Sequence, residues 1–237
     1  MIHQLIFAHA RPDWTEAQFQ NHWLNVHAVQ FASRIPQILL YKVNLRIDAD
    51  VPLPVFGPPF EGLAEIWVQN LEEQVASLRS PEFIDGARAD EPRWAAFWDT
   101  VFLPTDTMEL IGGPSEQCRP WPAKLYIVLK RRAGMPLGGF RGYLQKIHAD
   151  KLASLPGLRR LEVCTVIDAL YGAGEAMLDA VTLLSFDNAS ALEAAVRSDA
   201  FTQDILPDYD NFAERQYVRY FAAQEHWVIG PEPRERG

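Results

Sequence analysis

The chain contains two related halves, and this internal duplication constrains its fold more than any other feature of the sequence. Phe19 and His27 recur 121 positions later as Phe140 and His148. The segment SRIPQILLYKV recurs as SLPGLRRLEV after the deletion of one residue, and LRSPEF recurs as VRSDAF. Because the shift stays nearly constant as far as the closing MELIG and HWVIG segments, the repeated unit is a whole folding unit.

The repeat also predicts how the 237 residues divide. We predict repeat A at residues 1–112, a linker at 113–122, repeat B at 123–230 and a C-terminal tail at 231–237. The junction reads GGPSEQCRPWPA, and such a cluster of glycine and proline is typical of a connecting segment.

Both halves show the same order of secondary structure. In the second half, AKLYIVLKR alternates as a strand, and GGFRGYLQKIHADKLASL has apolar residues at helical spacing before Pro156 and Gly157. A second strand, a third strand (AVTLLSF), a helix after DNAS and a last strand (EHWVIG) follow. The order strand–helix–strand–strand–helix–strand predicts an α+β fold made of tandem ferredoxin-like repeats.

Each predicted sheet has helices on one face only, so its other face must be buried. Two such sheets in one chain can pair face to face and close an eight-stranded barrel. A barrel of that size has room for one small ligand.

One motif of repeat A resembles the EthD family of the dimeric α/β-barrel superfamily. The residues that carry the resemblance have the spacing F-x-x-x-W-x-x-x-H-A and then Y-x-V; they are Phe19, Trp23, His27, Ala28, Pro36, Tyr41 and Val43. The segments AEIWV (64–68) and DEPRW (90–94) are similar to third-strand and late-loop signatures of that family. Repeat B carries the motif more weakly, in KLYIVLKRR, Phe140 and His148.

The resemblance implies a dimeric α/β barrel, a fold that relatives usually build from two separate chains. Relatives include polyketide cyclases, a muconolactone isomerase, dehydratase-like proteins and proteins of ether-degradation clusters. Cofactor-free oxygenases and haem enzymes belong to the wider superfamily.

Charge and targeting signals narrow the range of partners. A net charge of −9 and a pI near 5.2 argue against binding to nucleic acid, and they give no support to attraction by an anionic membrane. The N-terminus lacks the basic region of a signal peptide, and no window reaches the roughly 18 apolar residues of a membrane span. The two cysteines form no C-x-x-C motif, so we expect a cytoplasmic protein.

Cofactor motifs are also missing from the sequence. No glycine-rich phosphate loop, no dinucleotide fingerprint and no zinc-binding Cys/His pattern occurs. We therefore expect neither a cofactor nor a metal.

Glu65 is the first candidate catalytic residue. On the strand AEIWV, Ala64, Ile66 and Val68 form an apolar face, so Glu65 and Trp67 should point into the barrel. Burial would raise the pKa of such a carboxyl toward the range of a general acid or base. The alternative is a structural ion pair with an inward cation such as Lys42.

His27 is the second candidate. It shares a helical face with Phe19 and Trp23, and the resemblance to the EthD family implicates the matching histidine at the pocket. The alternative is a packed histidine that serves the fold, an interpretation favoured by His148 at the same place in repeat B.

Other residues could line the same pocket. We predict that Trp23 and Trp67 form apolar walls, and that Lys42 and Asn44 stabilise an enolate oxygen. His9 and His148 are weaker substrate-binding candidates, and for His9 the favoured interpretation is solvent exposure. His22 is predicted at the surface, and a helical spacing places Trp94, Phe97 and Trp98 in the core.

Together these residues suggest a cofactor-independent lyase or isomerase that moves a proton next to a carbonyl. Its partner would be a small hydrophobic, oxygenated ring or polyketide-like compound, converted by dehydration, cyclisation or isomerisation. A cofactor-free or haem-binding oxygenase and a non-catalytic ligand-binding accessory protein are the alternatives. Pairing of two fused chains into a homodimer stays open.

Overall fold

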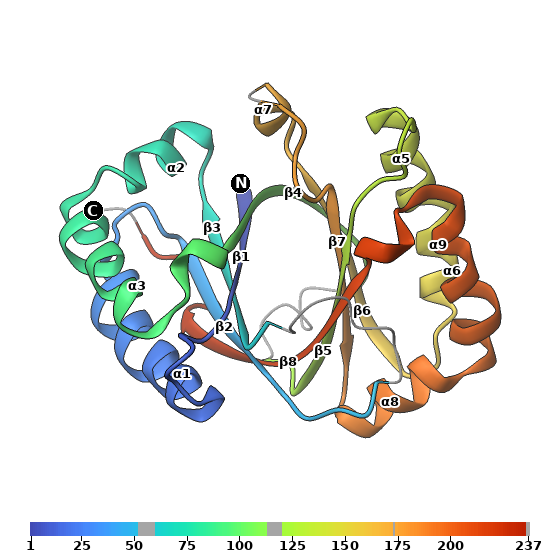
Figure 1. The fold of residues 1–237 in the computed structure, drawn as a ribbon, viewed down its shortest axis with the longest axis horizontal. Helices are drawn as coiled ribbons and strands as arrows, with labels where there is room; N and C mark the ends of the chain where they lie inside the picture. The colour runs from blue at the N-terminus through green and yellow to red at the C-terminus, as the bar shows by residue number, and fades with distance from the viewer. Residues whose placement is uncertain (52–59, 113–119, 173, 236–237) are drawn as a thin grey trace.

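The protein folds into a closed antiparallel barrel of eight strands with helices on two opposite sides (Figure 1). This architecture comes from a computed structural model that describes residues 1–51, 60–112, 120–172 and 174–235. Most of the predicted linker, residues 113–119, lies outside the described residues.

Each repeat contributes four strands to the barrel. Those of repeat A are β1 (Ile2–Ala8), β2 (Leu40–Arg46), β3 (Gly62–Val68) and β4 (Val101–Ile111). Those of repeat B are β5 (Ala123–Leu129), β6 (Leu158–Val166), β7 (Ala180–Phe186) and β8 (Arg219–Ile229).

The strand order confirms the predicted fold. Around the barrel it is β1-β3-β2-β8-β5-β7-β6-β4. Each repeat therefore forms its own four-stranded sheet, with the last strand next to the first, as in a ferredoxin-like unit. Antiparallel pairing of β2 with β8 and of β4 with β6 joins the two sheets. Both sheets of the barrel therefore come from one chain.

The helices of repeat A cover the outer face of its sheet, on the left of Figure 1. They are α1 (Glu16–His22), η1 (Trp23–Phe31), η2 (Ala32–Arg34), α2 (Leu71–Ser77), η3 (Glu82–Ala87), α3 (Arg88–Trp94) and η4 (Phe97–Asp99). A capping box between Thr15 and Gln18 starts α1, which continues without a break into the π-helical η1.

Most helices of repeat B cover the opposite side, on the right of Figure 1. They are α5 (Leu137–Tyr143), η5 (Leu144–His148), α6 (Ala149–Ala153), α7 (Asp168–Tyr171), α8 (Ala189–Arg197), η6 (Ala200–Ile205), α9 (Leu206–Phe212) and η7 (Arg215–Tyr217). No helix among the described ranges is both long and apolar enough to cross a membrane.

The alternation of side chains along the strands creates three buried layers. One core lies between the sheet and helices of each repeat, and a third fills part of the barrel interior, where Leu5, Phe7, Leu63 and Phe221 meet. On β3, Ala64 and Ile66 pack under the helices, as their apolar pattern predicts, and Glu65 points inward.

Two predictions about aromatic residues after α3 are wrong. Trp94 is buried, but Phe97 and Trp98 are 37% and 67% exposed. Helical spacing does not apply to them because α3 ends at Trp94 and Ala95 is extended, so the following 3₁₀ turn leaves the core.

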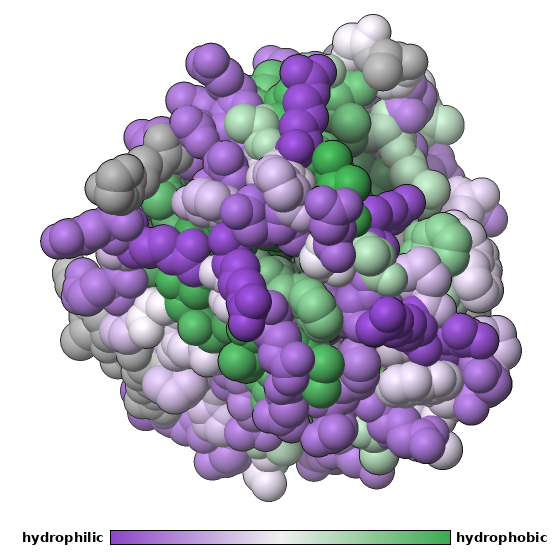
Figure 2. All heavy atoms as spheres, turned by 90° about the vertical axis from the view of Figure 1, so that its left-hand side faces the viewer, coloured by the Kyte–Doolittle hydropathy of each residue, from purple (hydrophilic) through white to green (hydrophobic). Residues whose placement is uncertain are grey.

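Figure 2 faces the helices of repeat A and shows apolar surface between the charged side chains.

Candidate active site in repeat A

A cavity of about 80 Å³ lies between the helices of repeat A and the outer face of its sheet. Apolar side chains such as Ile6, Ala64 and Ile66 form its floor. Its aromatic and titratable lining residues are Trp23, His27, Tyr41, Phe83, Glu91 and Trp94. The cavity is therefore largely apolar, with a few polar groups at its walls, which is the usual composition of a small-molecule site.

The spacing of the first helical segment positions three of these groups. Phe19, Trp23 and His27 are four residues apart, so α1 and η1 present them on one face toward α3. The ring of Trp94 meets them there, with centroids 5.1 Å from Trp23 and 4.8 Å from His27. The predicted grouping of Trp23 with His27 is present, and α3 supplies the opposite wall.

Asp90 holds His27 in place. The His27 Nδ1 and Asp90 Oδ2 atoms are 3.1 Å apart, and the same oxygen lies 3.0 Å from Nε2 of His22. Burial by itself would raise the pKa of Asp90, but the bonds to the two histidines lower it, so the carboxylate is charged. A proton on Nδ1 of His27 then donates to Asp90, which leaves Nε2 with a lone pair that can accept a proton.

That contact also corrects the prediction that His22 lies at the surface. Its side chain is only 19% exposed, because it packs between Trp14 and Trp94 while it reaches Asp90.

Two hydrogen-bond donors complete the wall of the cavity. The Tyr41 hydroxyl accepts a bond from Trp23 Nε1 at 3.3 Å, and no acceptor for its own proton occurs among the described residues. Burial raises the pKa of Tyr41, so this group stays a neutral donor. The indole nitrogen of Trp94 is buried and has no partner in the described part of the chain. A ligand oxygen in the cavity could satisfy either donor.

Glu91 brings a carboxyl group to the same cavity. Its Oε2 atom pairs with Nη1 of Arg88 at 2.7 Å, and its side chain is 25% exposed. Burial raises the pKa of Glu91, and the neighbouring Arg88 opposes that rise. Glu91 thus stands where the cavity meets solvent.

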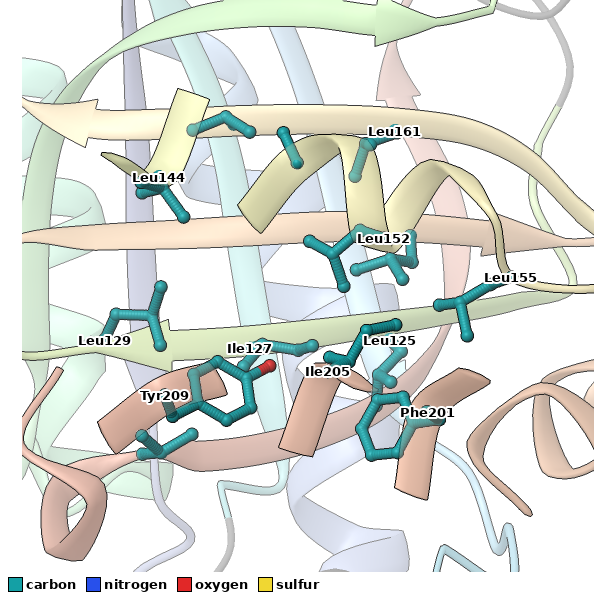
Figure 3. Packing of buried hydrophobic residues seen from close by; sticks show 14 of the residues in the cluster. Leu125, Ile127, Leu129, Leu144, Leu152, Leu155, Leu161, Phe201, Ile205 and Tyr209 are labelled. Carbon is teal, nitrogen blue, oxygen red and sulfur yellow. The ribbon is translucent and has the colours of Figure 1, made fainter. Parts of the chain in front are cut away.

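Repeat B fills the corresponding space with larger side chains. Ile205 stands where repeat A has Ala87, Tyr209 where it has Glu91, and Leu129 where it has Ala8. All three are fully buried in the core of repeat B. Figure 3 shows Ile205 and Tyr209 against Ile127 and the other side chains of the sheet.

Repeat B keeps the histidine–aspartate pair but lacks the two donors. His148 Nδ1 lies 2.8 Å from Asp208 Oδ2, and the two residues are the counterparts of His27 and Asp90. Leu161 replaces Tyr41, and Phe212 replaces Trp94. Burial lowers the pKa of His148, although its bond to Asp208 opposes the effect. In repeat B the histidine–aspartate pair therefore serves the fold. The cavity and the donors of Tyr41 and Trp94 belong to repeat A.

Glu65 lies in a different environment, inside the barrel. Its Oε1 atom accepts bonds from Lys124 Nζ at 2.5 Å, Tyr126 at 2.7 Å and Asn44 at 3.0 Å. Nε2 of His3 is 3.0 Å from Oε2. Burial alone would raise the pKa of Glu65, but the charge of Lys124, the bond from His3 and the charge of Lys42 hold it well below its usual range. The expectation of a raised pKa is wrong because these partners outweigh the loss of water.

Three other predicted pocket residues belong to this barrel cluster. Lys42 Nζ pairs with Glu225 at 3.0 Å and lies over the ring of Trp227. Trp67 stacks on His3 with ring centroids 4.0 Å apart, and Asn44 bonds to Glu65. The cation that contacts Glu65 directly is Lys124, from repeat B, and not Lys42.

His27 and Glu65 lie on opposite sides of the sheet. Ala64 and Ile66, the neighbours of Glu65, line the cavity together with His27, whereas Glu65 points into the barrel. The two candidates therefore do not meet. His9 is apart from both, at the end of β1, stacked on Phe60 and 3.3 Å from Glu61. It is 8% exposed, so the prediction of solvent exposure is wrong.

Three residues that line the cavity, Tyr41, Glu91 and Trp94, and Asp90, which contacts His27, were not identified as functional from the sequence. All four lie in the segments that resemble the EthD family, and the comparison of the repeats gives a second signal for Glu91. At the shift of 118 that aligns the later parts of the repeats, Glu91 faces Tyr209 and Ala87 faces Ile205. Repeat B has a bulky side chain at both positions, whereas repeat A has a carboxyl group at one and a methyl group at the other. The two repeats therefore cannot be packed alike at this place. Within the described ranges, no group of three or more His, Cys, Asp or Glu side chains is arranged to hold a metal ion.

Comparisons with known proteins agree with this architecture. The sequence profile of the EthD domain matches the chain twice, at residues 11–97 and 132–216. No protein of curated function matches the chain by sequence.

Several solved structures share the fold at low sequence identity. An anthrone oxidase-like protein is 12% identical, with a TM-score of 0.65, and the match covers 97% of this chain and 93% of that one. A protein of Lactobacillus acidophilus NCFM, provisionally described as a monooxygenase, is 11% identical with a TM-score of 0.52, covering 96% and 93%. A variant of chlorite dismutase from Candidatus Nitrospira defluvii is 12% identical with a TM-score of 0.51, covering 94% and 90%.

Proposed function

This chain belongs to the EthD domain family with two domains in one polypeptide, and from that premise we propose that repeat A catalyses proton transfer next to a carbonyl group. The substrate is a small, largely apolar compound, and the reaction uses side chains alone. The observation that supports this most is the position of His27, held by Asp90 at the wall of a cavity that also contains two hydrogen-bond donors.

In this reaction Nε2 of His27 removes a proton from the carbon next to the carbonyl. The charge of Asp90 stabilises the imidazolium that forms. Negative charge develops on the carbonyl oxygen, and the Tyr41 hydroxyl and the Trp94 indole N–H are the available donors for it. Return of the proton to another carbon gives isomerisation. Its return to a neighbouring hydroxyl, which then leaves as water, gives dehydration.

The size of the cavity limits the part of the substrate that it can enclose. Its volume of about 80 Å³ is smaller than the roughly 150 Å³ of an engineered cavity that holds benzene. A reacting group of a few heavy atoms fits, and a larger ring would remain partly outside, beside Phe83 and Glu91. The ring or polyketide-like substrate suggested by the sequence is therefore narrowed to a compound with a small reactive end.

We assign the remaining predicted site residues to the fold. Glu65, with Asn44, Lys42 and Trp67, belongs to a hydrogen-bonded cluster that joins the two repeats inside the barrel. His148 is the structural counterpart of His27.

The exchange of substrate hydrogen for solvent deuterium tests this function without the natural substrate. Butanone in D₂O should exchange its α-hydrogens faster with the protein than in buffer, as followed by proton NMR. His27→Gln should remove the effect, and His148→Gln should keep it. Equal exchange rates for the wild-type protein and for His27→Gln would overturn the proposal.

The same samples distinguish the two alternative functions. Oxygen consumption during incubation would point to an oxidative reaction. Binding of butanone to repeat A without any exchange would point to a ligand-binding accessory protein. The likeness to proteins described as oxidases or monooxygenases supports the fold only, since one fold serves many reactions.

A further inference from the structure

Glu91 gives the cavity a hydrogen-bond acceptor that the reaction above does not use. Arg88 occupies its Oε2 atom, and Oε1 has no partner among the described residues. The carboxyl is partly open to solvent, and it lines the same cavity as Trp94. A molecule that enters the cavity therefore meets an acceptor near the opening and donors deeper inside.

The comparison between repeats separates this acceptor from the requirements of the fold. Repeat B has the same helices, but Tyr209 stands at this position and fills the space, so no carboxyl group is present there. Arg88 is likewise specific to repeat A, since Leu206 is its counterpart. The pair is partly exposed, and an exposed ion pair adds little to stability, so the fold does not require a carboxyl at this position.

We propose that the cavity of repeat A selects hydroxycarbonyl compounds, whose carbonyl oxygen accepts from Trp94 and whose hydroxyl group donates to Glu91. This substrate class rests on the proposed function. It adds a hydroxyl group, which a dehydration would eliminate and an isomerisation would keep. In a dehydration, the proton leaves the α-carbon for Nε2 of His27, and the imidazolium then returns that proton to the hydroxyl, which departs as water as its C–O bond breaks and the C=C bond forms. Hydroxyl contact with Glu91 holds that leaving group at the opening of the cavity.

The preference for a hydroxyl depends on the charge of Glu91, so it depends on pH. The charged and titratable groups that act on this carboxyl are Arg88 and Asp90 on α3, His27 on η1 and Tyr41 on β2. Burial raises the pKa of Glu91 and Arg88 opposes the rise. The carboxylate is present above that pKa and is lost as the pH falls through it. Removal of Arg88 raises the pKa further and moves the loss to higher pH.

Binding of two matched probes tests the proposal independently of turnover. The dissociation constants of butanone and 4-hydroxybutan-2-one are measured by NMR titration of the isotope-labelled chain. The hydroxyketone should bind about tenfold more tightly, because a hydrogen bond to a charged acceptor is worth more than one between neutral groups. Glu91→Met, which keeps the volume but removes the acceptor, should bring the ratio close to one.

Two further variants check the role of charge. Arg88→Met should lose the preference at a higher pH than the wild-type protein does. Arg159→Met removes a comparable exposed ion pair in repeat B, between Arg159 and Asp187, and should leave the ratio unchanged.

The outcomes separate this proposal from the proposed function. A ratio near one in the wild-type protein would overturn the substrate class even if butanone exchange is observed. A ratio that persists in Glu91→Met would overturn the role of Glu91. A tenfold ratio that Glu91→Met abolishes, together with no exchange at all, would support the ligand class and refute the catalytic function.

Discussion

Glu91 and Tyr209 occupy the same position in their repeats, yet one lines a cavity and the other is fully buried in a packed core. The surrounding elements are the same in both repeats, since a helix with a buried histidine faces a helix with its aspartate partner. A few side chains therefore decide which repeat has room for a ligand.

His27→Gln should reduce exchange of butanone hydrogens by about 100-fold or more, the usual size of a general acid–base contribution. Asp90→Asn should also lower the rate, because the amide cannot stabilise an imidazolium as a carboxylate does. Rates are measured by proton NMR in D₂O. His148→Gln is the matched control in repeat B, and a loss of activity there equal to that of His27→Gln would contradict the assignment of one working site.

Ala87→Ile should close the cavity, because isoleucine is the residue that fills this place in repeat B. Butanone binding, measured by NMR titration, should be lost while thermal unfolding changes little. The reverse substitution, Ile205→Ala, should destabilise the protein by about 2–5 kcal/mol through the space it leaves. Undiminished binding by Ala87→Ile would show that the ligand lies elsewhere.

Tyr41→Phe should lower the exchange rate by about tenfold or more, since it removes a donor to the developing oxyanion. It also leaves Trp23 Nε1 without its acceptor, at a cost of about 1–3 kcal/mol in stability. Exchange kinetics and urea unfolding separate the two effects. A variant that loses stability but keeps the full exchange rate would exclude Tyr41 from the reaction.

Glu65→Gln should destabilise the protein at neutral pH by about 3–5 kcal/mol, because Lys124 would be left as a buried charge with fewer partners. The pKa of Glu65 is lowered in the folded state by Lys124, His3 and Lys42. Its stabilising contribution is therefore full above the pKa of the unfolded chain and is lost as the pH falls through the folded pKa.

Urea unfolding across the acidic range checks this linkage. The wild-type protein should lose stability as the pH drops below about 4.5, the ordinary range of a glutamate. Glu65→Gln should show a smaller dependence on pH. Equal slopes in the two proteins would mean that Glu65 is not held in its charged form by the fold.

Much of the fold could be predicted from the sequence because its signals are local and repeated. The constant shift identified two units, and the period of apolar residues identified the strands and helices. On β3, the apolar Ala64, Ile66 and Val68 correctly predicted that Glu65 points into the barrel. Where a turn follows α3, local spacing failed, and Phe97 and Trp98 lie at the surface.

The sequence by itself determined the duplication, the order of the strands along the chain and the face on which the residues of β3 lie, since these follow from periodicity along the chain. Only the tertiary structure decided which faces meet. It placed His27 and Glu65 on opposite sides of one sheet, surrounded Glu65 with Lys124 and His3, and set Asp90 beside His27. It also left a cavity at Ala87, whereas its counterpart Ile205 is buried in the core of repeat B, because the fit of side chains across elements depends on volumes that no single segment encodes.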